Sequence, residues 1–205
     1  MKEFLNGKYF QYVLVSSVSI PAGEVLSWVS AEKKLQLTST LPLPINNRYK
    51  TPETLGVDRI AAVCGALEIF PNRNCLVIDA GTAITYDFMD CDKNYWGGAI
   101  SPGIAMRFKA LHTLTERLPL IGATENFQLT GDSTETSIQS GVLYGVIGEM
   151  DGFISKYLNL HPDLGVVLTG GDTFFFENNL KQPIFAAREL VLSGLNRILQ
   201  HHATL

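Results

Sequence analysis

Polar side chains gather directly after an apolar run in "CLVIDAGTAITYDF", which spans Cys75 to Phe88. Asp79 brings a carboxylate to this cluster, and Thr82 and Thr85 bring hydroxyls, around a turn that contains Gly81. A short glycine turn after a buried strand exposes backbone N–H groups that suit an anion, usually a phosphate. Because a carboxylate and a phosphate repel each other in a cleft, the cluster indicates a cation between them and predicts a metal-bridged nucleotide.

A second glycine turn of this kind occurs in "TGGD", Thr169 to Asp172. The missing side chains of Gly170 and Gly171 leave room for a flat ring or a sugar close to the backbone. A bare hairpin with an Asp-Gly-Thr turn would carry the same letters as the first cluster, so each turn alone has a purely structural interpretation as well.

The stretch "YKTPETLGVDR", Tyr49 to Arg59, offers a further pair of charged groups. Asp58 and Arg59 begin a predicted helix directly after Gly56, so both side chains project near a positive helix end. Asp58 could remove a proton from a substrate hydroxyl while Arg59 holds an anionic group. The alternative is an aspartate that only stabilises the start of the helix.

Alternating strands and helices must position these groups, and their order predicts an α/β fold. Two strand and glycine-turn units indicate a duplicated architecture with a cleft between its halves. We expect a strand at 12–18, a hairpin of two strands at 75–88 and a strand near 164–169. We expect helices at 24–32, from 58 onward, at 135–158 and at 184–202, and a further helix that follows turn residues beginning at 94.

The long predicted helix carries an unusual glycine pattern. Gly141, Gly145, Gly148 and Gly152 fall on one helical face, although each glycine inside a helix costs roughly 1 kcal/mol relative to alanine. We hypothesise that another backbone, belonging to the same chain or to a second subunit, approaches this glycine stripe. The alternative is a helix whose glycines face solvent.

Composition excludes several classes of protein. The 205 residues are 46% apolar with a net charge of -4, and no run of Lys or Arg indicates nucleic-acid binding. The three cysteines, Cys64, Cys75 and Cys91, lie in or beside apolar segments and are expected to be reduced. No stretch reaches the ~18 apolar residues of a membrane span, so a cytoplasmic protein without a membrane partner is expected.

The clusters in this order resemble the type III pantothenate kinase family, of the actin, Hsp70 and sugar kinase superfamily. The likeness is carried by "YKTPETLGVDR", "DAGTAITYDF", "GGAISPG" with "LHTLTERLP", "GDSTETSIQSG" and "LTGGD". It implies a duplicated ribonuclease H-like α/β fold with a central cleft, with an incomplete first half at residues 1–74 and a second half at residues 75–205. It also implies ATP-dependent phosphorylation of pantothenate, the first step of coenzyme A synthesis.

The resemblance assigns roles to individual positions. Asp58 matches the general base and Asp79 the ligand of a monovalent cation, K⁺ or NH₄⁺. Thr134 matches a threonine that touches pantothenate, often across a dimer interface. The resemblance also implies a homodimer, in which the second subunit would contact the glycine stripe. Mg²⁺ is expected with ATP. The remaining positions are Tyr49, Gly56, Val57 and Arg59 for pantothenate, and Gly81, Thr82, Gly170 and Gly171 for ATP.

The sequence departs from this family at its beginning. Members open with an apolar strand that ends in an Asp-x-Gly-Asn-Thr turn, whereas "MKEFLNGKYFQYVLVSSVSI" contains no such turn. Without these phosphate contacts we expect weak or absent ATP turnover. Two interpretations stay open: a shortened form of an ordinary kinase, or a non-catalytic nucleotide- or pantothenate-binding regulator similar to the Bvg accessory factors.

Overall fold

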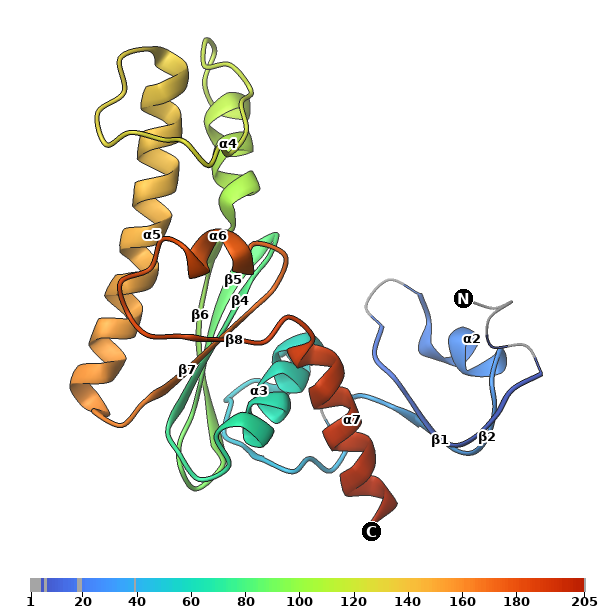
Figure 1. The fold of residues 1–205 in the computed structure, drawn as a ribbon. Coiled ribbons are helices and arrows are strands. Elements are labelled where there is room, and N and C mark those ends of the chain that lie inside the picture. Colours follow the sequence, from blue (N-terminus) through green and yellow to red (C-terminus); the bar gives the residue numbers. More distant parts are fainter. Residues whose placement is uncertain (1–4, 6, 18–19, 39, 205) are drawn as a thin grey trace.

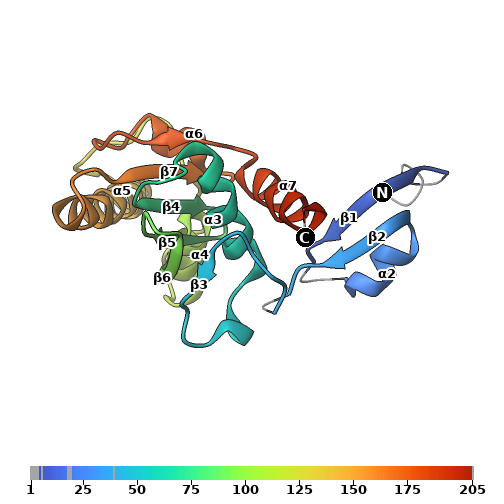
Figure 2. The same ribbon diagram turned by 90° about the horizontal axis from the view of Figure 1, so that it is seen from below.

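The computed structural model describes residues 5, 7–17, 20–38 and 40–204. A main body is built around one six-stranded sheet, and a small lobe lies beside it, near the C-terminal end of the chain (Figures 1 and 2). The small lobe consists of a two-stranded parallel sheet and a short helix.

The central sheet has the strand order β3-β6-β5-β4-β7-β8. β4, β5 and β6 form an antiparallel meander, and β7 and β8 extend it in parallel with β4. A meander continued by helix-connected parallel strands is the arrangement expected for a ribonuclease H-like half. The strands are β3 (Asn46–Asn47), β4 (Cys75–Ala80), β5 (Ala83–Met89), β6 (Asn94–Pro102), β7 (Gly165–Thr169) and β8 (Phe185–Ala186).

Helices cover both faces of this sheet and create two apolar cores. One core lies under α3 (Val57–Ile69) and α7 (Leu190–Ala203) and contains Val77 and Met89. The other lies under α4 (Ile104–Thr113), α5 (Thr134–Leu160) and the short α6 (Thr173–Glu177). Residues on the two sides of β4 alternate between the two cores, so the strand is buried completely apart from Asp79 near its end.

The small lobe contains β1 (Tyr9–Val15), α2 (Ala22–Ser27) and β2 (Ser30–Gln36), and a 3₁₀ turn at Pro52–Thr54 precedes α3. The lobe touches the end of α7, where Lys33 Nζ donates to the carbonyl of His202 over 3.1 Å. β3 and α3, both within residues 1–74, pack with the sheet of the second half. The division at residue 74 stays a prediction.

Several predicted elements need correction. The first strand lies at 9–15, earlier than predicted, and of the residues expected in it, position 18 lies outside the described part. The helix expected at 24–32 ends at Ser27, and the chain then forms β2. Asn94–Pro102 is β6, although its glycines were interpreted as a turn. The long helix is confirmed as α5, and the last helix begins at Leu190, later than predicted.

The glycine stripe faces open space in a single chain. A Cβ atom built on any of its four members would meet no atom within 4 Å. The part of the hypothesis that placed a backbone of the same chain against the stripe is therefore wrong. Contact with a second subunit stays a prediction.

A different glycine pair brings two helices into backbone contact. Gly65 of α3 faces the carbonyl of Leu190, and Gly194 of α7 faces the carbonyl of Ala61, so a Cβ at either position would overlap the opposite main chain. This contact allows α3, which carries Asp58 in its first turn, to lie directly against α7.

Replacement of Gly194 by alanine should therefore separate α7 from α3. We expect Gly194→Ala to destabilise the protein by about 1–3 kcal/mol, which lowers the melting temperature by roughly 2–4 °C per kcal/mol. The matched control is Gly23→Ala, at a helical glycine with no atom within 4 Å of its added Cβ, which should keep or raise the melting temperature. Equal melting temperatures for both variants would contradict this view of the helix contact.

Candidate active site

Two glycine turns meet at the ends of β4 and β7. The Asp172 amide donates to the carbonyl of Ala80 over 2.9 Å, which joins the turn after β7 to the end of β4. Gly170 has φ of +98°, and a Cβ there would lie 2.5 Å from Asp79 Oδ1. Only glycine allows this backbone conformation and this contact together. The structure therefore brings the two sequence-predicted turns into direct contact.

A third glycine supports the same hairpin tip. The Gly103 amide donates to the carbonyl of Thr82 over 3.0 Å, and a Cβ on Gly103 would overlap the carbonyl of Gly81. Gly103 also begins α4 as its N-cap residue. The tip of the β4–β5 hairpin is thus held from two sides, while Thr82 itself stays exposed.

Asp79 carries an unbalanced charge at this tip. In the described part of the chain no hydrogen-bond donor reaches its carboxylate. Burial raises the pKa of Asp79, and the nearby carboxylates of Asp58 and Asp87 raise it further. Asp58 and Asp79 are therefore close enough to repel each other, although they come from different elements.

Asp58 stands in the first turn of α3. Its Oδ1 accepts a hydrogen bond of 2.9 Å from the backbone N–H of Arg59. A Cβ on Gly56 would lie 2.5 Å from the same oxygen, so the glycine before the helix makes room for the carboxylate. No side chain caps this helix start. The second carboxylate oxygen of Asp58 accepts no hydrogen bond within the described residues, which leaves it available to a hydroxyl.

Arg59 is buried, with 7% of its surface exposed, and it forms an ion pair with Asp87 of β5. Its Nη2 lies 2.7 Å from Asp87 Oδ1, and its Nε donates to the same carboxylate. The guanidinium carbon lies 5.7 Å from the centre of the Tyr49 ring. Two of its three nitrogens are thus committed to the protein. The predicted contact of Arg59 with an anionic substrate stays a prediction, and Nη1 would have to make it.

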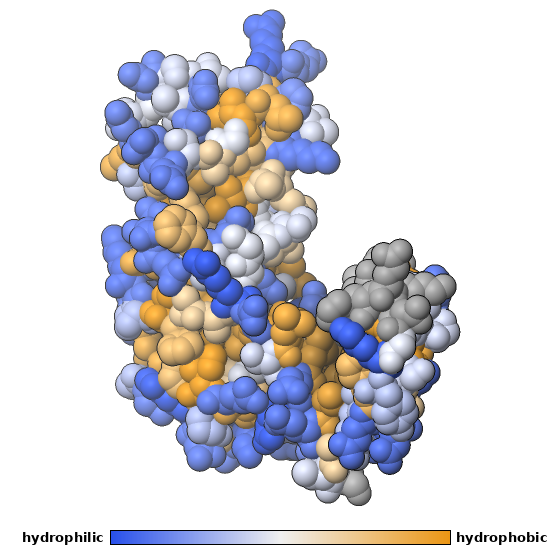
Figure 3. Space-filling view, turned by 45° about the vertical axis from the view of Figure 1, so that its right-hand side comes forward, coloured by the Kyte–Doolittle hydropathy of each residue, from blue (hydrophilic) through white to orange (hydrophobic). Residues whose placement is uncertain are grey.

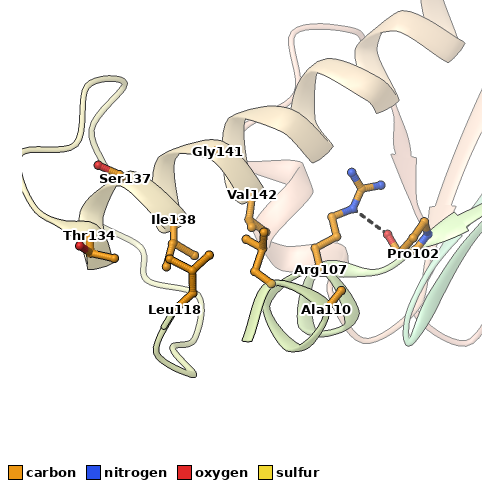
Figure 4. Close-up of a pocket in the computed structure, with 10 residues that line it drawn as sticks. Pro102, Arg107, Ala110, Leu118, Thr134, Ser137, Ile138, Gly141 and Val142 are labelled. Atoms are coloured by element: carbon orange, nitrogen blue, oxygen red, sulfur yellow. Dashed lines mark hydrogen bonds between the residues drawn. The ribbon is translucent and has the colours of Figure 1, made fainter. Parts of the chain in front are cut away.

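Thr134 is not part of this group. It is the first residue of α5, which begins at the top of the molecule in Figure 1, away from α3. It lines a cavity of about 770 Å³ between α4 and α5, with Thr134 and Ser137 toward one end and Arg107 toward the other (Figure 4). Apolar side chains line the cavity between these two ends. Within one chain the structure does not bring Thr134 to Asp58.

A second cavity, of about 830 Å³, lies beside the turn that follows β7. Asp172 and Phe175 line it from the turn and α6, and Lys109 and His112 line it from α4. Burial raises the pKa of Asp172. Figure 3 shows apolar surface in the upper part of the molecule, where α4 and α5 lie. This cavity has the size and apolar character of a small-molecule site next to Gly170 and Gly171.

The carboxylates fit a cation that is completed by other ligands. Among the described residues, no group of three or more His, Cys, Asp or Glu side chains gathers that could hold a metal alone. Asp79 nevertheless offers an unpartnered carboxylate beside a second acidic residue, and Mg²⁺ commonly binds through one or two carboxylates plus substrate phosphates.

Within the described part of the chain, every helix is too short or too polar to cross a bilayer.

Comparison with known proteins decides the family. The model of the family described as type III pantothenate kinase matches residues 1–156. The chain belongs to the type III pantothenate kinase family. The resemblance inferred from the sequence motifs is therefore confirmed.

Individual relatives agree with this assignment. The type III pantothenate kinase of Phocaeicola vulgatus is 51% identical over 168 residues, which cover 82% of this chain and 69% of the relative. That of Porphyromonas gingivalis is 43% identical over 201 residues, which cover 94% of this chain and 81% of the relative.

A solved structure shares the fold. A conserved protein of Campylobacter jejuni, assigned to the Baf family of transcriptional activators, matches with a TM-score of 0.64 at 22% identity. The alignment covers 100% of this chain and 89% of that one. At this identity the likeness concerns the fold alone. Together with the strand order, it confirms the predicted α/β class.

Sequence reasoning missed Asp87, which is fully buried and pairs with Arg59. The signal was an ionisable residue between Tyr86 and Phe88 in an otherwise apolar strand. It also missed the ion pair between Arg107 and Glu149, 2.7 Å long, which links α4 to α5 beside the first cavity. Neither pair could be assigned without the fold, because the partners lie 28 and 42 residues apart.

The charge of Asp79 should cost stability in the free protein. A carboxyl whose pKa is raised by folding binds its proton more tightly in the folded state, so stability falls as the pH rises through the raised pKa. In buffer without K⁺ or Mg²⁺ at pH 7, Asp79→Asn should raise the melting temperature, by roughly 2–4 °C for each kcal/mol of repulsion removed. The gain should vanish below the ordinary value of 3.8.

Asp90→Asn, in the turn between β5 and β6, is the control. Burial opposes the shift, but hydrogen bonds from Trp96 and Asn94 lower the pKa of Asp90. Its ionised form therefore stabilises the protein above pH 3.8. Asp90→Asn should lower the melting temperature at pH 7. The interpretation of Asp79 is wrong if Asp79→Asn also lowers it under these conditions.

Proposed function

We propose that this protein transfers the γ-phosphoryl group of ATP to the hydroxyl of pantothenate, the first step of coenzyme A synthesis. The observation that carries the proposal is the juxtaposition of Asp58 at the start of α3 with the hairpin tip that bears Asp79. Phosphoryl transfer requires mainly positioning and charge neutralisation, with one group to orient the acceptor hydroxyl. The membership of the chain in a kinase family supports the same reaction.

ATP would use the two glycine turns. Gly81 and Thr82 at the hairpin tip offer a backbone turn and a hydroxyl to the phosphates, while Gly170 and Gly171 let the nucleoside approach the main chain. The cavity of about 830 Å³ beside these glycines is large enough for the adenosine. Asp172 at its edge follows directly on Gly171.

Cations would balance the charge at the tip. A monovalent ion, K⁺ or NH₄⁺, is proposed at Asp79, whose carboxylate has no hydrogen-bond donor within the described residues. Mg²⁺ is proposed with the phosphates of ATP, where it neutralises developing charge. Asp79 would hold its ion beside the triphosphate, and the raised pKa of the free carboxyl would fall on binding.

Pantothenate would lie over the start of α3. Asp58 would accept the proton of the reacting hydroxyl or orient it, and Gly56 and Val57 would border the substrate. Tyr49 lies beside Arg59, so both could contact the same molecule. The proposed acceptor site is therefore built from one short stretch of chain that the fold turns toward the hairpin tip.

Thr134 can join this site only from a second subunit. It lies at the far end of α5, so a homodimer is proposed in which the partner places its own Thr134 near pantothenate. The open glycine stripe supports this arrangement, because its four positions leave room for another backbone. A cytoplasmic location is proposed from the substrates. The weak turnover expected from the sequence stays a prediction that a rate assay tests.

Asp58→Asn tests the proposed base. The amide keeps the shape of the side chain but cannot accept the hydroxyl proton, so kcat should fall about 10²–10⁴-fold. ADP release measured with pantothenate present and absent gives the rate, and circular dichroism checks the fold. Thr54→Ala, on the exposed 3₁₀ turn before α3, serves as the control and should keep the wild-type rate. Full activity of Asp58→Asn would remove it from catalysis.

Gly145→Leu tests the proposed dimer contact. If a partner backbone covers the stripe, the added side chain should cost about 1–3 kcal/mol at the interface and raise the dimer dissociation constant roughly 10- to 100-fold. Sedimentation equilibrium measures this constant. Gly23→Leu, at a helical glycine with equal room, is the matched control and should leave it unchanged. A dissociation constant that Gly145→Leu does not alter would contradict the interface.

A further inference from the structure

A buried carboxylate in the middle of the sheet has no role in the reaction proposed above. Asp87 of β5 has 0% of its surface exposed, and it lies two strands away from the edge at β3. A buried charge is costly unless it is paired and hydrogen-bonded. The residues that pair with Asp87 therefore indicate its role in the structure.

Side chains from two other elements donate hydrogen bonds to this carboxylate. Arg59 of α3 donates from Nε over 2.9 Å and from Nη2 over 2.7 Å to Oδ1, and more weakly from Nε to Oδ2 over 3.2 Å. The Tyr95 hydroxyl of β6 donates to Oδ1 over 2.6 Å. Asp87 thus ties α3 to the β5–β6 hairpin through short, charge-assisted bonds.

The first turn of α3 packs on the core through Val57 and Ile60, but no side-chain cap holds it. Its N-cap residue, Gly56, has no side chain to cap the helix, and no side-chain cap bond is formed there. Asp58 and Arg59 are consecutive, and the N–H of Arg59 holds Asp58 Oδ1. The position of the Asp58 carboxylate therefore follows the position of the Arg59 backbone, which the Asp87 pair fixes.

The same group extends to Tyr49. Its ring stacks near Tyr95 with centroids 6.2 Å apart, and it lies against the guanidinium of Arg59. Gly97, at φ of +89°, leaves room for the Tyr49 ring, since a Cβ on residue 97 would lie 2.6 Å from that ring. Tyr49 thus contacts Arg59 and Tyr95, the two residues that donate to the Asp87 carboxylate.

We propose that Asp87 is a positioning residue for the phosphoryl transfer, which fixes the Arg59 guanidinium and with it the reacting carboxylate of Asp58. This inference rests on the proposed function. A buried ion pair often adds little net stability compared with apolar residues, whereas it fixes geometry strongly. Catalysis is sensitive to such geometry, because a displacement of about 1 Å can cost about 10²-fold in rate.

Asp87→Asn tests the proposal, because it removes the charge and keeps the size of the side chain. We expect kcat to fall about 100-fold, with the KM for ATP within about twofold of wild type because the glycine turns are untouched. Ile154→Ala, in the core on the other face of the sheet, is the control for lost stability and should keep kcat below its melting temperature. Equal losses of kcat in both variants would overturn the proposal.

Crystal structures of wild type and Asp87→Asn without substrate give a readout that does not depend on activity. We expect the Asp58 carboxylate to move by about 1 Å or to occupy several positions. An unchanged Asp58 overturns the proposal, whereas a displaced Asp58 in a protein that does not phosphorylate pantothenate refutes only the proposed function. If Asp87→Asn does not fold, Tyr95→Phe removes a single bond to Asp87 and should lower kcat about 5-fold; an unchanged kcat there overturns the proposal.

Discussion

The candidate site depends on an imbalance of charge, because the carboxylates of Asp58, Asp79 and Asp87 lie near one another with a single ion-paired guanidinium, that of Arg59. Arg59 pairs with Asp87 deep in the sheet, and among the described residues no Lys or Arg pairs with Asp58 or Asp79. Burial and the neighbouring carboxylates raise the pKa of Asp79, which disfavours its charge in the free protein. The same feature supports the proposal of a cation at this position.

Close backbone contacts make this charge arrangement sterically feasible. Gly170 and Gly103 both contact the backbone of the hairpin tip, and Gly65 with Gly194 allows α3 and α7 to approach each other closely. Each contact replaces a side chain by the main chain of a neighbouring element, so the turns approach more closely than any other residue would permit. The four glycines of the stripe on α5 differ from these, since a Cβ added to any of them would meet no atom of the same chain within 4 Å.

The sequence allowed the hairpin, α3 and α5 to be predicted, because their periodicity is strong and their turns carry glycine at the required places. It did not reveal β2, whose Lys33 and Lys34 hide the alternation, or β6, whose Gly97 and Gly98 read as a turn. Position 98 of β6 requires glycine because a Cβ there would overlap the backbone carbonyl of Tyr86 on β5. Asp58 and Asp79 could be selected from local motifs. Asp87 could not, because its role depends on the ion pair with Arg59, which forms only in the folded chain.

The position of Thr134 sets the final constraint on any mechanism. One chain brings together Asp58, Asp79 and the cavity beside the turn after β7, whereas Thr134 lines a separate cavity between α4 and α5, which Pro102 and Leu118 also border. The α5 helix connects the two regions, since its buried face packs on β4 and β5 while its open face carries the glycine stripe. A second subunit that covers this stripe would bring its α5 helix alongside, and the acceptor site would then depend on association as well as on the fold of one chain.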